Sequence, residues 1–254
     1  MNVKKVWSRL VVRRALLMIP FCVLIGAVVD IVSTFCDNIF LQDVDQEGYA
    51  VTAVTVLITF FFTTRVFLAF FYPFCLWGIR SLTPRFSQAC RVEWAEAAGR
   101  LILVVLYTLL MGNIIAMELV SEPTQTTLYN VYSWTGVFTD LINCLVIFLL
   151  LDGMRALLPG KENAAFRRTV RIFQCFWILL NLYENFIFAG CFLVFVESIP
   201  DWFRTLLSFH DNHPWVDFLL QTMTLIASIF LLIGGRKINR SCENLKDLDK
   251  IINI

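Results

Sequence analysis

Residues 172–196 read IFQCFWILLNLYENFIFAGCFLVFV, and the interpretation of the whole chain depends on this stretch. At ~1.5 Å per residue, about 20 apolar residues are enough to cross the ~30 Å hydrocarbon layer of a bilayer. Asn181, Glu184 and Asn185 lie near the middle of the stretch. A carboxylate at that depth costs on the order of a few kcal/mol unless a partner or water stabilises it. The stretch therefore predicts a membrane-spanning helix whose Glu184 is stabilised by a partner elsewhere in the chain or by water.

The composition favours a multi-pass membrane protein. Of the 254 residues, 58% are hydrophobic and 16% are charged, whereas an ordinary soluble domain is about 45–50% apolar and about 25% charged. The eight cysteines lie mostly inside apolar runs without a CxxC spacing, which is typical of small buried side chains and not of a disulfide or zinc framework. We expect the lipid bilayer as a partner, no nucleic acid and no cofactor.

The expected fold class is all-α, a polytopic membrane bundle of six transmembrane helices that forms one integral membrane domain over residues 1–254. Residues 236–254 form a short tail. One or two interfacial helices are expected as well, at 84–98 and 199–207, because apolar residues recur there at helical spacing. A turn is expected at Pro159-Gly160, and Gly234-Gly235 are expected to close the last helix. The six expected spans are 15–36, 51–77, 101–120, 131–151, 172–196 and 216–235.

The distribution of charge predicts the orientation. When the amino terminus, the second and fourth connections and the tail are assigned to one side, that side holds 19 of the 21 Lys and Arg residues. The exceptions are Arg65, inside a span, and Arg204. Cytoplasmic loops are enriched in Lys and Arg, so we expect both termini in the cytoplasm. The localisation expected is a plasma membrane or a bacterial inner membrane.

Eight polar side chains are expected at depth in the membrane and form the candidate solute site. Arg65 is too deep to reach water easily, and Asp140 and Glu184 are the acids at matching depth. Asp140 and Asn143 are three residues apart and share a helix face, as do the polar residues of the fifth span. The full set is Asp30, Arg65, Asn113, Asp140, Asn143, Asn181, Glu184 and Asn185.

Two interpretations of this set stay open. In the first, the charged groups and amides line a hydrated pocket for an ion or a polar solute. In the second, Arg65 pairs with one acid and the amides hydrogen-bond between helices, at about 0.6–2 kcal/mol per contact. Three deep carboxylates against one arginine leave an excess of acid, which favours the pocket.

A weaker candidate site is His210-Asp211-Asn212-His213, which holds both histidines of the chain. His210, Asp211 and His213 could bind a divalent metal, but this is not a recognised ligand spacing. We therefore expect a solvated loop there and no metal. No GxSxG, HExxH or phosphate-binding glycine loop is present.

The leading function is a small transporter or channel-like protein for a cation, a proton or a small polar solute. The first alternative is a non-catalytic membrane subunit or assembly protein that binds a protein partner through its basic loops or tail. An intramembrane enzyme is the second alternative, and the missing catalytic motifs weigh against it.

Overall fold

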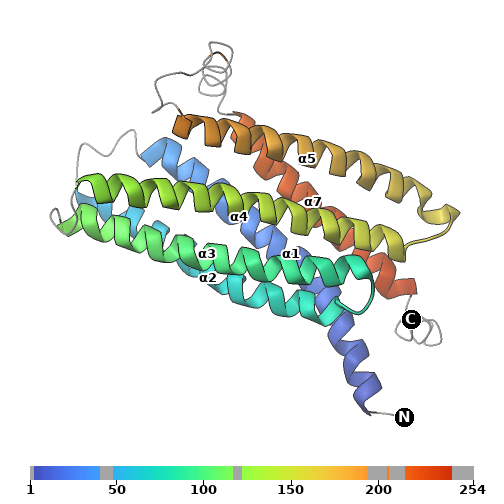
Figure 1. Ribbon diagram of the computed structural model, residues 1–254. Helices are drawn as coiled ribbons and strands as arrows, with labels where there is room; N and C mark the ends of the chain where they lie inside the picture. Colours follow the sequence, from blue (N-terminus) through green and yellow to red (C-terminus); the bar gives the residue numbers. More distant parts are fainter. Residues whose placement is uncertain (1–2, 41–47, 117–121, 194–204, 206–214, 242–254) are drawn as a thin grey trace.

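Figure 1 shows the computed structural model, in which long helices run side by side along a common direction. It describes residues 3–40, 48–116, 122–193, 205 and 215–241, and towards some helix ends it describes the backbone alone. No strand occurs among these residues, so the expected all-α fold class is confirmed. The helices are α1 (Val3–Phe40), α2 (Gly48–Ile79), α3 (Pro84–Ala116), α4 (Glu122–Leu157), the short 3-10 helix η2 (Lys161–Asn163), α5 (Ala164–Leu193) and α7 (Trp215–Ser241).

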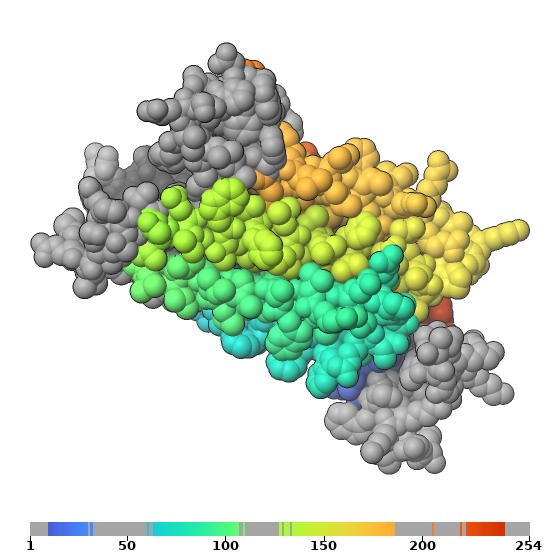
Figure 2. All heavy atoms as spheres, viewed as in Figure 1, coloured from blue at the N-terminus to red at the C-terminus, as the bar shows by residue number. Residues whose placement is uncertain are grey.

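The helices close into a ring in which the first and the last are neighbours. Helix α1 packs against α2 and α7, and α3 packs against α2 and α4. Helix α7 also contacts α4, which completes the ring, and α5 lies against both α4 and α7. Helices α3, α4 and α5 lie side by side along one face of the molecule (Figure 2).

Each expected span overlaps one of these helices, but the helices are longer than the spans. Among the described residues, two segments are long and apolar enough to cross a membrane, Leu10–Val29 and Asn130–Leu157. A third apolar segment, Thr63–Ile79, is shorter. A buried helix of a soluble protein or a signal sequence would meet the same criterion, so length and hydropathy alone do not establish six spans.

The expectation of a separate interfacial helix at 84–98 is wrong. These residues form the first half of α3, which continues without a break to Ala116. Phe86 and Cys90 are buried in the core, while Trp94 is exposed. Two of the three residues of the apolar stripe that suggested a membrane surface therefore pack inside the bundle. The second expected interfacial helix, 199–207, lies outside the described residues apart from Thr205.

The expectation that Gly234-Gly235 end the last helix is also wrong, because α7 continues to Ser241. The two glycines lie where α7 approaches its neighbours most closely. A Cβ on Gly235 would be 2.6 Å from the backbone oxygen of Leu16 on α1, and one on Gly234 would be 2.7 Å from the sulfur of Met154 on α4. Small residues let helix backbones approach each other in this way.

The turn at Pro159-Gly160 is confirmed. Helix α4 ends at Leu157, and Gly160 adopts a φ of 103° before η2 begins. This is the left-handed region, which glycine occupies without a steric penalty. The reversal brings α5 back along α4, where the indole Nε1 of Trp177 donates a hydrogen bond to the carbonyl oxygen of Cys144 at 3.4 Å.

The basic connections lie together at one end of the bundle. Figure 1 places the start of α1, the α2–α3 and α4–α5 connections and the end of α7 at this end, which we call the basic end. Ionic and polar contacts join its helices: Arg85 Nε lies 2.9 Å from Asp152 Oδ2, and Arg155 Nη1 donates to Gln174 Oε1 at 2.9 Å. The connections that carry most of the Lys and Arg residues of the sequence are thus gathered at one end of the bundle.

The glycine contact between α7 and α1 generates a stability prediction. We expect Gly235→Ala to lower the free energy of unfolding by about 1–3 kcal/mol, the usual cost of overpacking, because the added methyl meets a backbone atom. Gly136→Ala is the matched control, since nothing lies within 4 Å of its added Cβ and alanine favours helix. Thermal unfolding of the two purified variants measures the difference. Equal melting temperatures would contradict the close packing.

Candidate functional site

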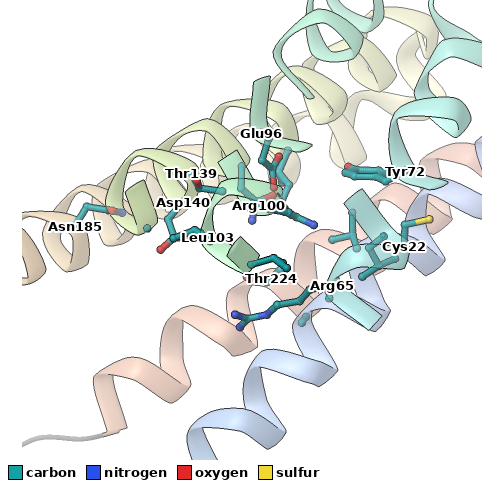
Figure 3. Close-up of a pocket in the computed structure, with 18 of the residues that line it drawn as sticks. Cys22, Arg65, Tyr72, Glu96, Arg100, Leu103, Thr139, Asp140, Asn185 and Thr224 are labelled. Atoms are coloured by element: carbon teal, nitrogen blue, oxygen red, sulfur yellow. Dashed lines mark hydrogen bonds and ion pairs between the residues drawn. The ribbon is translucent and has the colours of Figure 1, made fainter. Parts of the chain in front are cut away.

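A polar cavity of about 320 Å³ lies between the helices (Figure 3). Every long helix contributes at least one lining residue, from Cys22 on α1 to Thr224 on α7. Among the lining side chains, both basic and acidic groups and several hydroxyls are present. The polar lining residues are Arg65, Tyr72, Glu96, Arg100, Tyr132, Thr139, Asp140, Asn143, Glu184, Asn185 and Thr224.

The cavity brings together five of the eight polar residues expected at depth. Arg65 enters from α2, Asp140 and Asn143 from α4, and Glu184 and Asn185 from α5. Arg65 and Asp140 are exposed and Glu184 is half-buried, so these charges have access to the open space of the cavity. The expected clustering of charge is therefore found, whereas the expected pairing of Arg65 with one particular acid stays a prediction.

Among the described residues, the amide nitrogens of Asn181 and Asn185 donate within α5 and not to another helix. Asn181 Nδ2 donates to the carbonyl oxygen of Trp177 at 2.9 Å, and Asn185 Nδ2 donates to that of Asn181 at 2.8 Å. Both contacts lie within α5. Asn181 is buried but does not line the cavity.

Gln174, which the sequence did not single out, makes an interhelical contact of the kind expected of the asparagines. Its side chain is buried, and its Nε2 donates to the carbonyl oxygen of Phe148 on α4 at 3.0 Å. Gln174 Oε1 accepts a hydrogen bond from Arg155, which also lies on α4. Gln174 therefore ties α5 to α4 close to the basic end.

The remaining expected residues are not tested by side-chain geometry. Asp30 lies on α1 and Asn113 on α3, but only their backbones are described. His210, Asp211 and His213 lie outside the described residues. Within the described part of the chain, no group of three His, Cys, Asp or Glu side chains could hold a metal ion.

Sequence reasoning missed two buried glutamates on α3. Glu96 lines the cavity and forms an ion pair with Arg100, one turn further along the helix. Glu93 and Glu96 both have a relative exposure of 0%. Figure 3 shows Glu96 and Arg100 close together, with Tyr72 of α2 on the same side of the cavity. The signal was present in the sequence, because both glutamates continue the stripe begun by Phe86 and Cys90 at helical spacing.

The surroundings of Glu93 favour its protonated, neutral form. Burial, and after it the charge of Glu96, raises the pKa of the Glu93 carboxyl well above its usual value, against the opposing effect of Arg100. Glu93 Oε1, Glu93 Oε2 and Glu96 Oε2 are buried without another donor among the described residues. A proton on one Glu93 oxygen that is donated to Glu96 Oε2 would satisfy these two atoms and leave Glu96 to balance Arg100.

The fold and this cavity define the protein as an all-helical bundle with a charged polar interior. Comparisons with protein-family models, with curated proteins and with solved structures give no match.

The raised pKa of Glu93 predicts how stability depends on pH. Because the folded pKa lies above the unfolded one, the stabilisation is complete below about pH 4.3, the ordinary value for Glu, and is lost as the pH rises through the folded pKa. In that window, stability should fall by up to about 1.4 kcal/mol per pH unit. The Glu93→Gln variant resembles the protonated acid, so its melting temperature should fall less and should exceed that of the wild type at pH 7–8.

Thermal unfolding between pH 4 and pH 8 measures this effect. The control is Glu162→Gln, which alters an exposed glutamate in the α4–α5 connection and should keep the wild-type pH dependence. If Glu93→Gln followed the wild-type curve in parallel, Glu93 would be ionised in the folded protein and the assignment would be wrong.

Proposed function

We propose that this protein is a small multi-pass membrane transporter or channel-like protein that binds a cation, a proton or a small polar solute in its central cavity. Its six long helices would cross the bilayer, with the basic end and both termini on the cytoplasmic side of a plasma membrane or a bacterial inner membrane. The observation that carries this proposal is the gathering of Arg65, Asp140 and Glu184 around one cavity inside the bundle.

The outer surface supports the membrane part of the proposal. Large apolar side chains point outward at intervals of three or four residues on the long helices, whereas soluble monomers rarely expose large continuous apolar patches. A lipid environment removes the cost of exposing this surface. On α2 and α4 these residues are Phe60, Phe67, Phe70, Phe74, Trp77, Val131, Trp134, Phe138, Leu141 and Leu145.

The helix contacts agree with packing in a bilayer. Between lipid-facing helices the hydrophobic effect gives little attraction, so close contact through small residues has to hold them together. Gly78 of α2 lies against Val11 and Ala15 of α1. Gly235 of α7 also lies against α1, at its backbone. The basic end also corresponds to the cytoplasmic enrichment in Lys and Arg.

The charges of the cavity favour a positively charged ligand. Its wall holds two arginines, Arg65 and Arg100, and three acids, Glu96, Asp140 and Glu184. Glu96 is balanced by Arg100, so Asp140 and Glu184 together exceed Arg65 by one negative charge. A cation, or a proton on one carboxylate, would neutralise this excess, which is costly at low dielectric.

A membrane subunit remains the second candidate, favoured by one observation. Near the basic end, Gln174 and Arg155 tie α5 to α4, and the ion pair of Arg85 with Asp152 ties α3 to α4. A rigid end of this kind would suit the binding of a protein partner. In that case the cavity would be dry and its charges would only stabilise the helix packing.

Access of water to the cavity separates the two candidates. After replacement of the native cysteines, a single cysteine in place of Asn143, which lines the cavity, should react with a membrane-impermeant thiol reagent in intact cells or inverted vesicles. Val146→Cys, three residues further along α4 at 0% exposure and away from the cavity, is the matched control. Reaction of neither cysteine until the protein is unfolded would favour the subunit.

The role of the excess acid is tested by ion flux. In proteoliposomes with an imposed K⁺, Na⁺ or H⁺ gradient, we expect the wild-type protein to carry at least one of these ions. Asp140→Asn should lower that flux by about tenfold or more, because it removes one of the carboxylates that line the cavity. The same change from carboxylate to amide outside the cavity, Glu162→Gln, should leave the flux unchanged. Equal loss in both variants would contradict a specific role of the cavity.

A further inference from the structure

A second hollow, of about 430 Å³, lies at the basic end between α1 and α7. Its wall holds four arginines, two from each helix, and no acidic residue is among the described residues that line it. Two leucines and one asparagine complete the wall. We call this hollow the arginine groove; its lining residues are Leu10, Arg13, Arg14, Leu17, Arg236, Asn239 and Arg240.

The two helices hold the arginines on opposite sides of the groove. Helix α7 approaches α1 closely at Gly235, directly before Arg236. One turn further on, Asn239 Nδ2 donates to the backbone oxygen of Arg13 at 3.4 Å. These contacts fix the spacing between the arginines of α1 and those of α7. Four guanidinium groups thus line one groove, and an anion placed between them would interact favourably with each.

The groove is apolar as well as basic. Leu10 is 45% exposed, and Leu17 forms part of the wall. Towards the middle of the bundle the exposed surface continues through Met18 and Phe21 of α1 and Ile233 of α7. A ligand that fits this surface has an anionic group for the guanidinium groups and a hydrocarbon part for the apolar surface beside them.

We propose that the arginine groove is a binding site for an anionic phospholipid, with its phosphate between the arginines of α1 and α7 and an acyl chain along Leu10 and Leu17. Guanidinium groups bind phosphate through paired, charge-assisted hydrogen bonds, which is why arginine is favoured at phosphate sites. Basic pockets between membrane helices at the cytoplasmic face are suited to acidic lipid headgroups. A free phosphate would leave the apolar part of the groove without a role.

This inference rests on the proposed membrane location but not on solute transport. The groove and the central cavity have no lining residue in common, and they lie on different surfaces of α1 and α7. Lipid binding can therefore be measured on a protein whose cavity is inactive.

Native mass spectrometry of the delipidated protein in detergent tests the proposal, with phosphatidylglycerol and phosphatidylcholine as probes. We expect the wild type to retain phosphatidylglycerol in preference to phosphatidylcholine. The double variant Arg13→Gln/Arg240→Gln should bind phosphatidylglycerol about 30-fold more weakly, which corresponds to about 1 kcal/mol for each arginine. The matched control is Arg168→Gln/Arg171→Gln, two exposed arginines of α5 outside the groove, and it should bind like the wild type.

Further binding measurements of the same kind identify the ligand. Leu10→Ser should also weaken phosphatidylglycerol binding, while millimolar inorganic phosphate should not displace the lipid. Equal weakening in the two arginine double variants, or displacement by phosphate alone, would overturn the proposal. Displacement by a peptide of residues 243–254, which carries three acids, would also overturn it in favour of an acidic peptide.

Melting temperatures show whether each variant is folded, since bound lipid should raise that of the wild type and of the control. Preferential binding without ion flux would leave this inference standing and remove the transport proposal. Ion flux without preferential lipid binding would leave the transport proposal standing and overturn this inference.

Discussion

Helices α1 and α7 touch at Gly235, and the arrangement of the other helices depends on this contact. It allows the last helix of the chain to lie directly on the backbone of the first, so that α1, α2, α3, α4 and α7 close into a ring. Without closure, the polar side chains of the interior would face the surroundings of the bundle. With it, they surround a cavity on one side of the contact, and the arginine groove lies on the other.

The charged residues of the interior fall into two groups, those buried on α3 and those accessible within the cavity. Glu96 and Arg100 compensate each other within one helix turn, and burial raises the pKa of the Glu93 carboxyl, which favours its neutral form. The groups on α2, α4 and α5 are arranged differently, because Arg65 and Asp140 remain accessible within the cavity. Balanced charges are suited to holding helices together, whereas accessible ones are suited to meeting a ligand.

Part of this architecture could be predicted from the sequence. The positions of Asp140, Asn143, Glu184 and Asn185 followed from helical periodicity, since residues three or four apart must share a face. Glu93 and Glu96 were missed because a stripe with apolar residues on one face and charges nearby resembles a surface helix. Only tertiary contact with α2 and α4 shows that the stripe is internal.

The expectation that Gly234 and Gly235 end the helix was wrong for a different reason. Gly-Gly followed by basic residues is typical of a helix end, and a single sequence does not show the neighbouring backbone that requires the absence of a side chain. Gly160, by contrast, was predicted correctly, because a turn after proline depends on local conformation alone.

The closure of the ring has a consequence for how the protein is made. The hydrogen bond between Asn239 and Arg13 joins residues 226 positions apart, so it forms only after all the residues between them have been synthesised. Until then the face of α1 that carries Leu16 lacks its final neighbour, and neither the cavity nor the groove is complete. Helix α1 must wait for α7, and chains cut short before α7 would present an open bundle to the machinery of quality control.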